Sequence, residues 1–142
     1  MLDLWLILHF IGVALGVGTS FALLTLGLST SDMAPAERAA FMRRASVVGV
    51  NGSIGLLLLI TSGVGLLLTR GVQEVMAWGG PMFHIKLMLV VILIGVFGYL
   101  QVLVRKSRSA DGAAAAARIP LISRIMLLLG VSVIVFAVLA FH

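Results

Sequence analysis

The chain has 142 residues, of which 61% are hydrophobic and 11% are charged. A soluble globular domain carries about 25% charged residues, so this chain cannot cover its own surface with polar groups and we expect its solvent to be lipid. It contains no cysteine, which excludes disulfides, thiolate metal sites and iron–sulfur clusters.

Four apolar segments are each long enough to cross a bilayer, which takes about 20 residues. We expect these spans at residues 4–28, 45–69, 81–104 and 119–141. They predict an all-α fold, a four-transmembrane-helix bundle that forms a single integral membrane domain.

The segments between the spans are short. The one that contains Pro35 and Glu37 predicts a short interfacial helix that leads into the second span. Pro120 is expected in the first turn of the fourth helix, where no backbone N–H is needed. The preceding alanine run, 113–117, is itself prone to form helix.

Basic residues gather in two of the loops. Loops 29–44 and 105–118 carry seven lysines and arginines, whereas the opposite side has Arg70 alone outside the spans. Because basic loops are retained in the cytoplasm, we expect both termini and loop 70–80 on the outer (periplasmic) side of a bacterial-type inner membrane. Trp5 and Trp78 then fall at the outer interface, where aromatic side chains collect. The net charge of +5 is thus a feature of membrane topology, and we expect no nucleic-acid partner.

Ionisable side chains lie at matched depth in this topology. His9 in the first span, and His84 and Lys86 in the third, fall roughly 5 to 8 Å from the outer ends at the helical rise per residue. His142, at the end of the fourth span, lies on the same side. Ionisable groups inside an apolar span are costly, and their default interpretation is functional. Lys86 is about 200° around the helix from His84, so we expect one of them to line a site while the other reaches the surface.

A stripe of small residues follows His9 on its helical face. Gly12, Gly16 and Ser20 stand at i+3, i+7 and i+11. Such a stripe lets another helix, or a flat ligand, approach the backbone. In the second case Gly12 and Gly16 contact the bound cofactor.

Two imidazoles beside a flat small-residue surface suit a haem, whose iron takes axial histidine. His9 is the first candidate ligand and His84 the second. Lys86 or Arg70 is placed to meet a haem propionate. The polar residues Thr61 and Ser62 of the second span are adequately explained by interhelical hydrogen bonds.

Other interpretations of these residues stay open. His9 and His84 as interfacial residues bonded to backbone or lipid headgroups would need no cofactor. Copper is a further candidate, because Met82, His84 and Met88 lie close on one span, and thioether with imidazole suits Cu(I). A non-catalytic subunit that stabilises a larger membrane assembly would have the same spans and bind nothing.

The opening of the first and third spans resembles a known family. The first carries Trp5 and then His9-Phe10-Ile11-Gly12, and the third begins His84-Ile85-Lys86-Leu87 after Trp78-Gly79. The chain resembles the HemJ type of protoporphyrinogen IX oxidase and, in plan, the copper-resistance CopD-like proteins and an uncharacterised group of small four-span proteins.

The resemblance to the HemJ type implies haem b as the cofactor. It also implies an essential pair of a first-helix histidine and a third-helix lysine, which here are His9 and Lys86, with Lys86 in the catalytic role. We therefore predict a small haem-b-binding redox protein. With glycine in every span, we expect it to pack against copies of itself or other membrane subunits.

Overall fold

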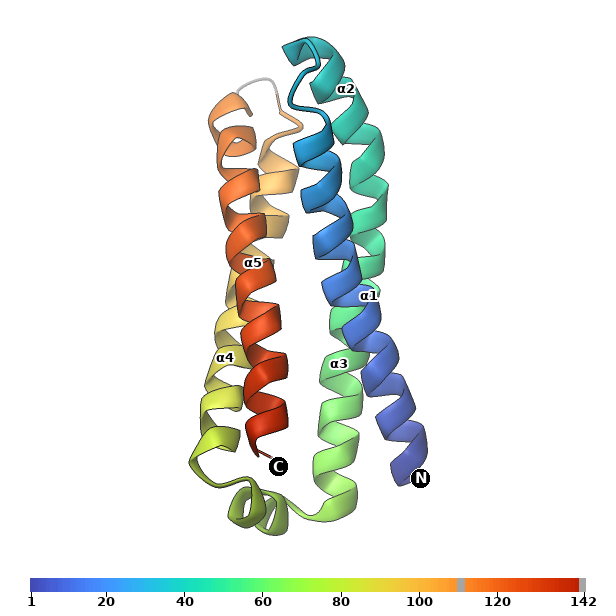
Figure 1. The fold of residues 1–142 in the computed structure, drawn as a ribbon, viewed down its shortest axis with the longest axis vertical. Helices are drawn as coiled ribbons and strands as arrows, with labels where there is room; N and C mark the ends of the chain where they lie inside the picture. Colours follow the sequence, from blue (N-terminus) through green and yellow to red (C-terminus); the bar gives the residue numbers. More distant parts are fainter. Residues whose placement is uncertain (110–111, 141–142) are drawn as a thin grey trace. The chain divides into compact units, whose positions relative to one another are not determined.

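The computed structural model describes residues 1–109 and 112–140. The helices are α1 (Leu2–Ser29), α2 (Pro35–Ala45), the 3-10 turn η1 (Ser46–Val48), α3 (Gly49–Arg70), α4 (Val72–Lys106) and α5 (Ala113–Ala140) (Figure 1). The described residues contain no strand, which confirms the all-α prediction for that part of the chain.

Four helical segments of the described chain are long and apolar enough to cross a membrane. They are Leu2–Ser29, Pro35–Arg70, Val72–Lys106 and Ala117–Ala140. Each predicted span overlaps one of them. The protein is therefore a multi-pass membrane protein, as its composition indicates.

The short helix predicted before the second span is present as α2, but no break separates it from that span. The backbone stays helical through both junctions, with φ −61°, ψ −26° at Ala45 and φ −59°, ψ −26° at Val48. Pro35 stands at the start of α2, where its missing N–H costs nothing. The apolar helix thus begins well before the residue that hydropathy alone indicates.

Segment 70–80, expected as a loop, is mostly helical. Its helical part, residues 72–79, lies between two glycines with positive φ, Gly71 (φ 87°) and Gly80 (φ 54°, ψ −151°). Glycine adopts such angles without the steric cost that a Cβ brings. Pro81 then opens the long part of α4 at a position that suits its fixed φ.

The fourth helix begins earlier than predicted, and the expectation for Pro120 is wrong. α5 starts at Ala113, and Pro120 lies inside it rather than in its first turn. The high helix propensity of alanine explains the early start. The predicted end of the span at residue 141 and the expected position of His142 lie outside the described residues.

The chain divides into two compact units, Met1–Val75 and Met76–His142. In the first unit α1 packs against α3 along its length. In the second unit α4 and α5 lie side by side (Figure 1), and both line the same cavity. The candidate residues are described within the unit to which each belongs.

Small residues form the contact between α1 and α3. A Cβ on Gly55 would lie 2.6 Å from the Gly16 nitrogen and 2.9 Å from the Gly12 oxygen, which real side chains do not tolerate. Further along, a Cβ on Gly52 would lie 3.3 Å from Thr19. The two backbones therefore touch, as small-residue stripes allow in membrane helices.

Candidate functional site

A hydrogen bond between α1 and α3 of the first unit holds His9. Its Nδ1 atom lies 3.0 Å from the Oγ atom of Ser62 on α3. Ser62 is completely buried and His9 is half-buried. The prediction of an interhelical hydrogen bond is confirmed for Ser62, and its partner is the candidate ligand itself. The same prediction is wrong for Thr61, whose hydroxyl donates to the Leu57 carbonyl of its own helix.

The surroundings of Ser62 decide which nitrogen of His9 carries the proton. The Ser62 hydroxyl lies 2.5 Å from the Leu58 carbonyl oxygen and 3.3 Å from that of Leu59. Two oxygens as close as the first pair need a hydrogen between them, so the single hydroxyl proton is donated to the backbone. Ser62 therefore accepts from His9, and Nδ1 carries the proton. In a neutral imidazole the lone pair then lies on Nε2.

Glycines of α3 make room for the aromatic side chains of α1. A Cβ on Gly63 would lie 3.8 Å from Cε1 of His9, in ordinary contact. A Cβ on Gly65 would lie inside the contact distance of three atoms of the Trp5 ring. Trp5 and His9 are one helical turn apart on α1, so both rings lie on the α3 side of the helix.

Gly12 and Gly16 continue this face of α1, and they contact α3. A Cβ on Gly12 would lie 2.9 Å from the Gly55 oxygen and 2.9 Å from Leu59, and one on Gly16 would lie 3.9 Å from Leu59. A helix or a flat ligand was expected beside these small residues, and in the structure the helix α3 lies there. The role of Gly12 and Gly16 toward a cofactor remains a prediction.

His84 lies in the second unit, one turn into the long part of α4. Its Nδ1 atom is 2.9 Å from the Gly80 carbonyl oxygen, and its side chain is exposed. Because a carbonyl only accepts, Nδ1 of His84 donates, and the lone pair of the neutral ring again lies on Nε2. Gly80, where the backbone is non-helical, thus supplies the acceptor for the His84 ring, and no sequence pattern indicates this contact.

Lys86 has a different environment from that of His84. Its Nζ atom lies 6.0 Å from the centre of the Phe83 ring, within the range of a cation–π interaction. Phe83 is buried and Lys86 is half-buried. His9 belongs to the first unit, and His84 and Lys86 to the second, so a site that all three share remains a prediction.

The contact with Ser62 gives His9 an arrangement that metal-ligating histidines share. Ligating histidines donate their second ring N–H to an oxygen acceptor, which fixes the tautomer and the ring orientation. His9 has this arrangement through Ser62. Within residues 1–109 and 112–140, no group of three or more His, Cys, Asp or Glu side chains is placed to hold a metal ion.

The sequence matches no protein-family model, and neither a curated protein nor a solved structure matches it.

Proposed function

We propose that this chain is a small haem-b-binding redox protein of the membrane and that Nε2 of His9 supplies an axial ligand to the iron. The observation that carries the proposal is the 3.0 Å hydrogen bond between His9 Nδ1 and the buried Ser62 hydroxyl. This hydrogen bond keeps the proton on Nδ1, so that the lone pair of Nε2 can bind the haem iron.

The residues around His9 prepare the ring for this role. Ser62 fixes the tautomer and the ring plane, and a hydrogen bond to the second nitrogen also raises the basicity of the ligand. Gly63 lets the ring lie close to α3. When bound, the haem would supply one-electron chemistry, whereas the chain binds and orients it.

Two residues of the second unit have secondary roles in this proposal. His84 is the second candidate ligand, because the Gly80 carbonyl holds its Nδ1 in the same way. Lys86 is the candidate partner for a haem propionate or for the substrate. The resemblance to the HemJ type of protoporphyrinogen IX oxidase supports His9 and Lys86 as the essential pair, and oxidation of a porphyrinogen is the finer form of the proposal.

The proposed orientation places both termini outside the cytoplasm of a bacterial-type cell. Its support is the seven-to-one bias of basic residues between the two sides. The last turns of α2 and α4 carry two basic residues each, Arg43 with Arg44 and Arg105 with Lys106. The His9 end of α1 then lies at the outer leaflet.

A non-catalytic subunit of a larger membrane assembly is the second candidate. Its support is the small buried fraction of the four spanning segments: only 6% to 17% of the apolar stretch of each segment is buried. Copies of this chain or other membrane subunits would cover part of the remainder, and lipid the rest. Copper handling through Met82, His84 and Met88 is the third hypothesis and predicts bound metal without a haem spectrum.

The haem content of matched histidine variants tests the ligand assignment. The chain is expressed with added haem, purified in detergent and assayed as the pyridine haemochrome. We expect His9→Ala to lose the haem and His84→Ala to retain more of it. Native-level haem in His9→Ala would show that the assignment is wrong, and a native chain without haem would favour the accessory-subunit or copper hypothesis.

A further inference from the structure

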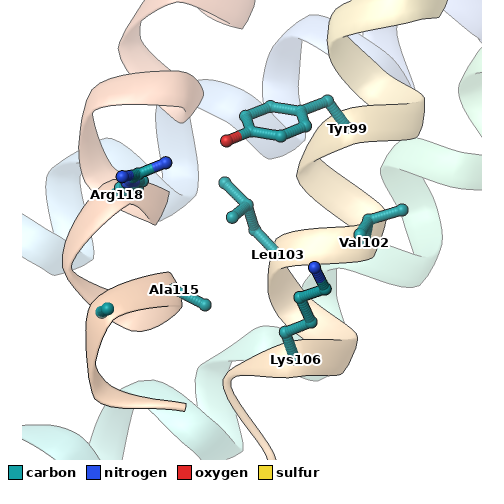
Figure 2. Close-up of a pocket in the computed structure, with 7 residues that line it drawn as sticks. Tyr99, Val102, Leu103, Lys106, Ala115 and Arg118 are labelled. Carbon is teal, nitrogen blue, oxygen red and sulfur yellow. The ribbon is translucent and has the colours of Figure 1, made fainter. Parts of the chain in front are cut away.

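A cavity of about 240 Å³ lies between the C-terminal end of α4 and the N-terminal end of α5 (Figure 2). Its lining consists of Tyr99, Val102, Leu103 and Lys106 from α4 and Ala114, Ala115 and Arg118 from α5. The α4 residues stand at i, i+3, i+4 and i+7, which is one face of a helix. All seven belong to the second unit.

The polar groups of this cavity suit an anion. Its charged lining residues, Lys106 and Arg118, are both basic and both exposed. Figure 2 shows the Tyr99 hydroxyl pointing across the cavity toward the Arg118 side. Guanidinium, ammonium and phenol groups are all donors that bind phosphate oxygens.

The apolar part of the same cavity runs along α4 from Lys106 back toward the middle of the helix. Leu103, which lines the cavity, is 5% exposed, whereas Val102 is 46% and Tyr99 43% exposed. Tyr99 lies about 10 Å from Lys106 along the helix axis at the usual rise. A charged mouth at the helix end therefore continues into an apolar wall within a membrane-spanning segment.

We propose that this cavity binds the headgroup of an anionic phospholipid. Lys106 and Arg118 contact the phosphate, the Tyr99 hydroxyl donates to a headgroup oxygen, and the acyl chain lies along Val102. Basic pockets between membrane helices bind anionic headgroups in this way. A free phosphate would use the charged mouth alone, and the exposed apolar wall beside it favours the lipid. The proposal does not depend on haem.

Native mass spectrometry of the full chain in detergent tests the proposal, with phosphatidylglycerol and phosphatidylcholine of identical acyl chains as probes. We expect the native chain to retain phosphatidylglycerol preferentially. The double variant Lys106→Gln/Arg118→Gln should bind it about tenfold more weakly or worse. Equal retention of the two lipids by the native chain would overturn the proposal.

The control variant Arg105→Gln/Arg108→Gln removes the same charge at neighbouring positions outside the cavity lining. We expect its phosphatidylglycerol binding to stay within about twofold of native, because charge near the membrane without the cavity contributes only a diffuse attraction. An equal loss in both double variants would show that general basic charge, and not this cavity, retains the lipid.

A Tyr99→Phe variant and a competition with inorganic phosphate complete the experiment. Tyr99→Phe removes one hydroxyl and no charge, and a loss of about threefold is expected for one hydrogen bond; unchanged binding would contradict the assigned cavity. Millimolar ammonium phosphate is added to the same samples. Lipid adducts that persist support a phospholipid site, whereas their displacement by phosphate would show that the cavity takes a free anion.

Discussion

His9 donates its Nδ1 proton to the Ser62 hydroxyl, 3.0 Å away on the neighbouring helix of the same unit. The Ser62 hydroxyl in turn donates a hydrogen bond to the carbonyl oxygen of Leu58. One buried serine thus connects the backbone of α3 to the imidazole of α1. This connection makes the orientation of His9 a property of the helix pair rather than of α1 alone.

The first prediction concerns Ser62. Ser62→Ala keeps the small volume that the helix contact needs but removes the acceptor, so the ring loses its fixed tautomer. We expect haem affinity to fall by about 10- to 100-fold, as for other partners of metal-bound histidine. Haem titration followed at the Soret band measures it. Thr61→Ala is the matched control, because the Thr61 hydroxyl bonds only its own helix, at Leu57. Equal affinities in both variants would exclude this role for Ser62.

The second prediction concerns the contact of α1 with α3. Gly55→Ala would place a Cβ 2.6 Å from the Gly16 nitrogen, and the backbones must separate. We expect a loss of about 1–3 kcal/mol in the free energy of unfolding in detergent. Gly18→Ala, where nothing lies within 4 Å, should be neutral or slightly stabilising. Thermal unfolding of both variants measures the difference, and similar midpoints would contradict the described contact.

The third prediction concerns the turn at Gly80. In Gly80→Ala, a residue with a Cβ must adopt φ 54°, ψ −151°, angles that only glycine adopts easily. We expect the free energy of unfolding to fall by about 1–3 kcal/mol. Gly98→Ala, in the same helix with open space around it, is the control. Denaturant unfolding in detergent compares them. If Gly80→Ala is as stable as Gly98→Ala, segment 72–79 does not end in this turn.

The fourth prediction concerns orientation in the membrane. Because the chain has no cysteine, single cysteines report on one position each. In intact cells we expect a membrane-impermeant maleimide to label Gln73→Cys but to label Ser31→Cys only after permeabilisation. Both positions are exposed, so labelling depends on sidedness. The reverse pattern would show that the basic loops do not lie in the cytoplasm.

The helices themselves could be predicted from the sequence, because long apolar runs need no partner to be recognised. Their ends were less predictable. Hydropathy placed the start of the fourth helix at residue 119, whereas the propensity of the alanine run carries α5 back to Ala113. At Gly80 the backbone turn depends on a left-handed φ that hydropathy does not report.

The sequence indicates which residues are candidates for a site, but it does not indicate what they contact. The spacing of Gly12 and Gly16 indicated a close approach to the α1 backbone, and α3 makes it. Sequence patterns give no register between two helices, so they did not pair His9 with Ser62. The tautomer of His9 depends on that pairing and can be inferred only from the structure.

Whether this chain binds haem at all is the first question to answer, and an absorption spectrum of the detergent-purified protein answers it. The protein is expressed with added haem and measured oxidised and then reduced with dithionite. We expect a Soret band in both spectra and sharpened visible bands on reduction. A spectrum without a Soret band would show that the chain binds no haem and that His9 is not a haem ligand.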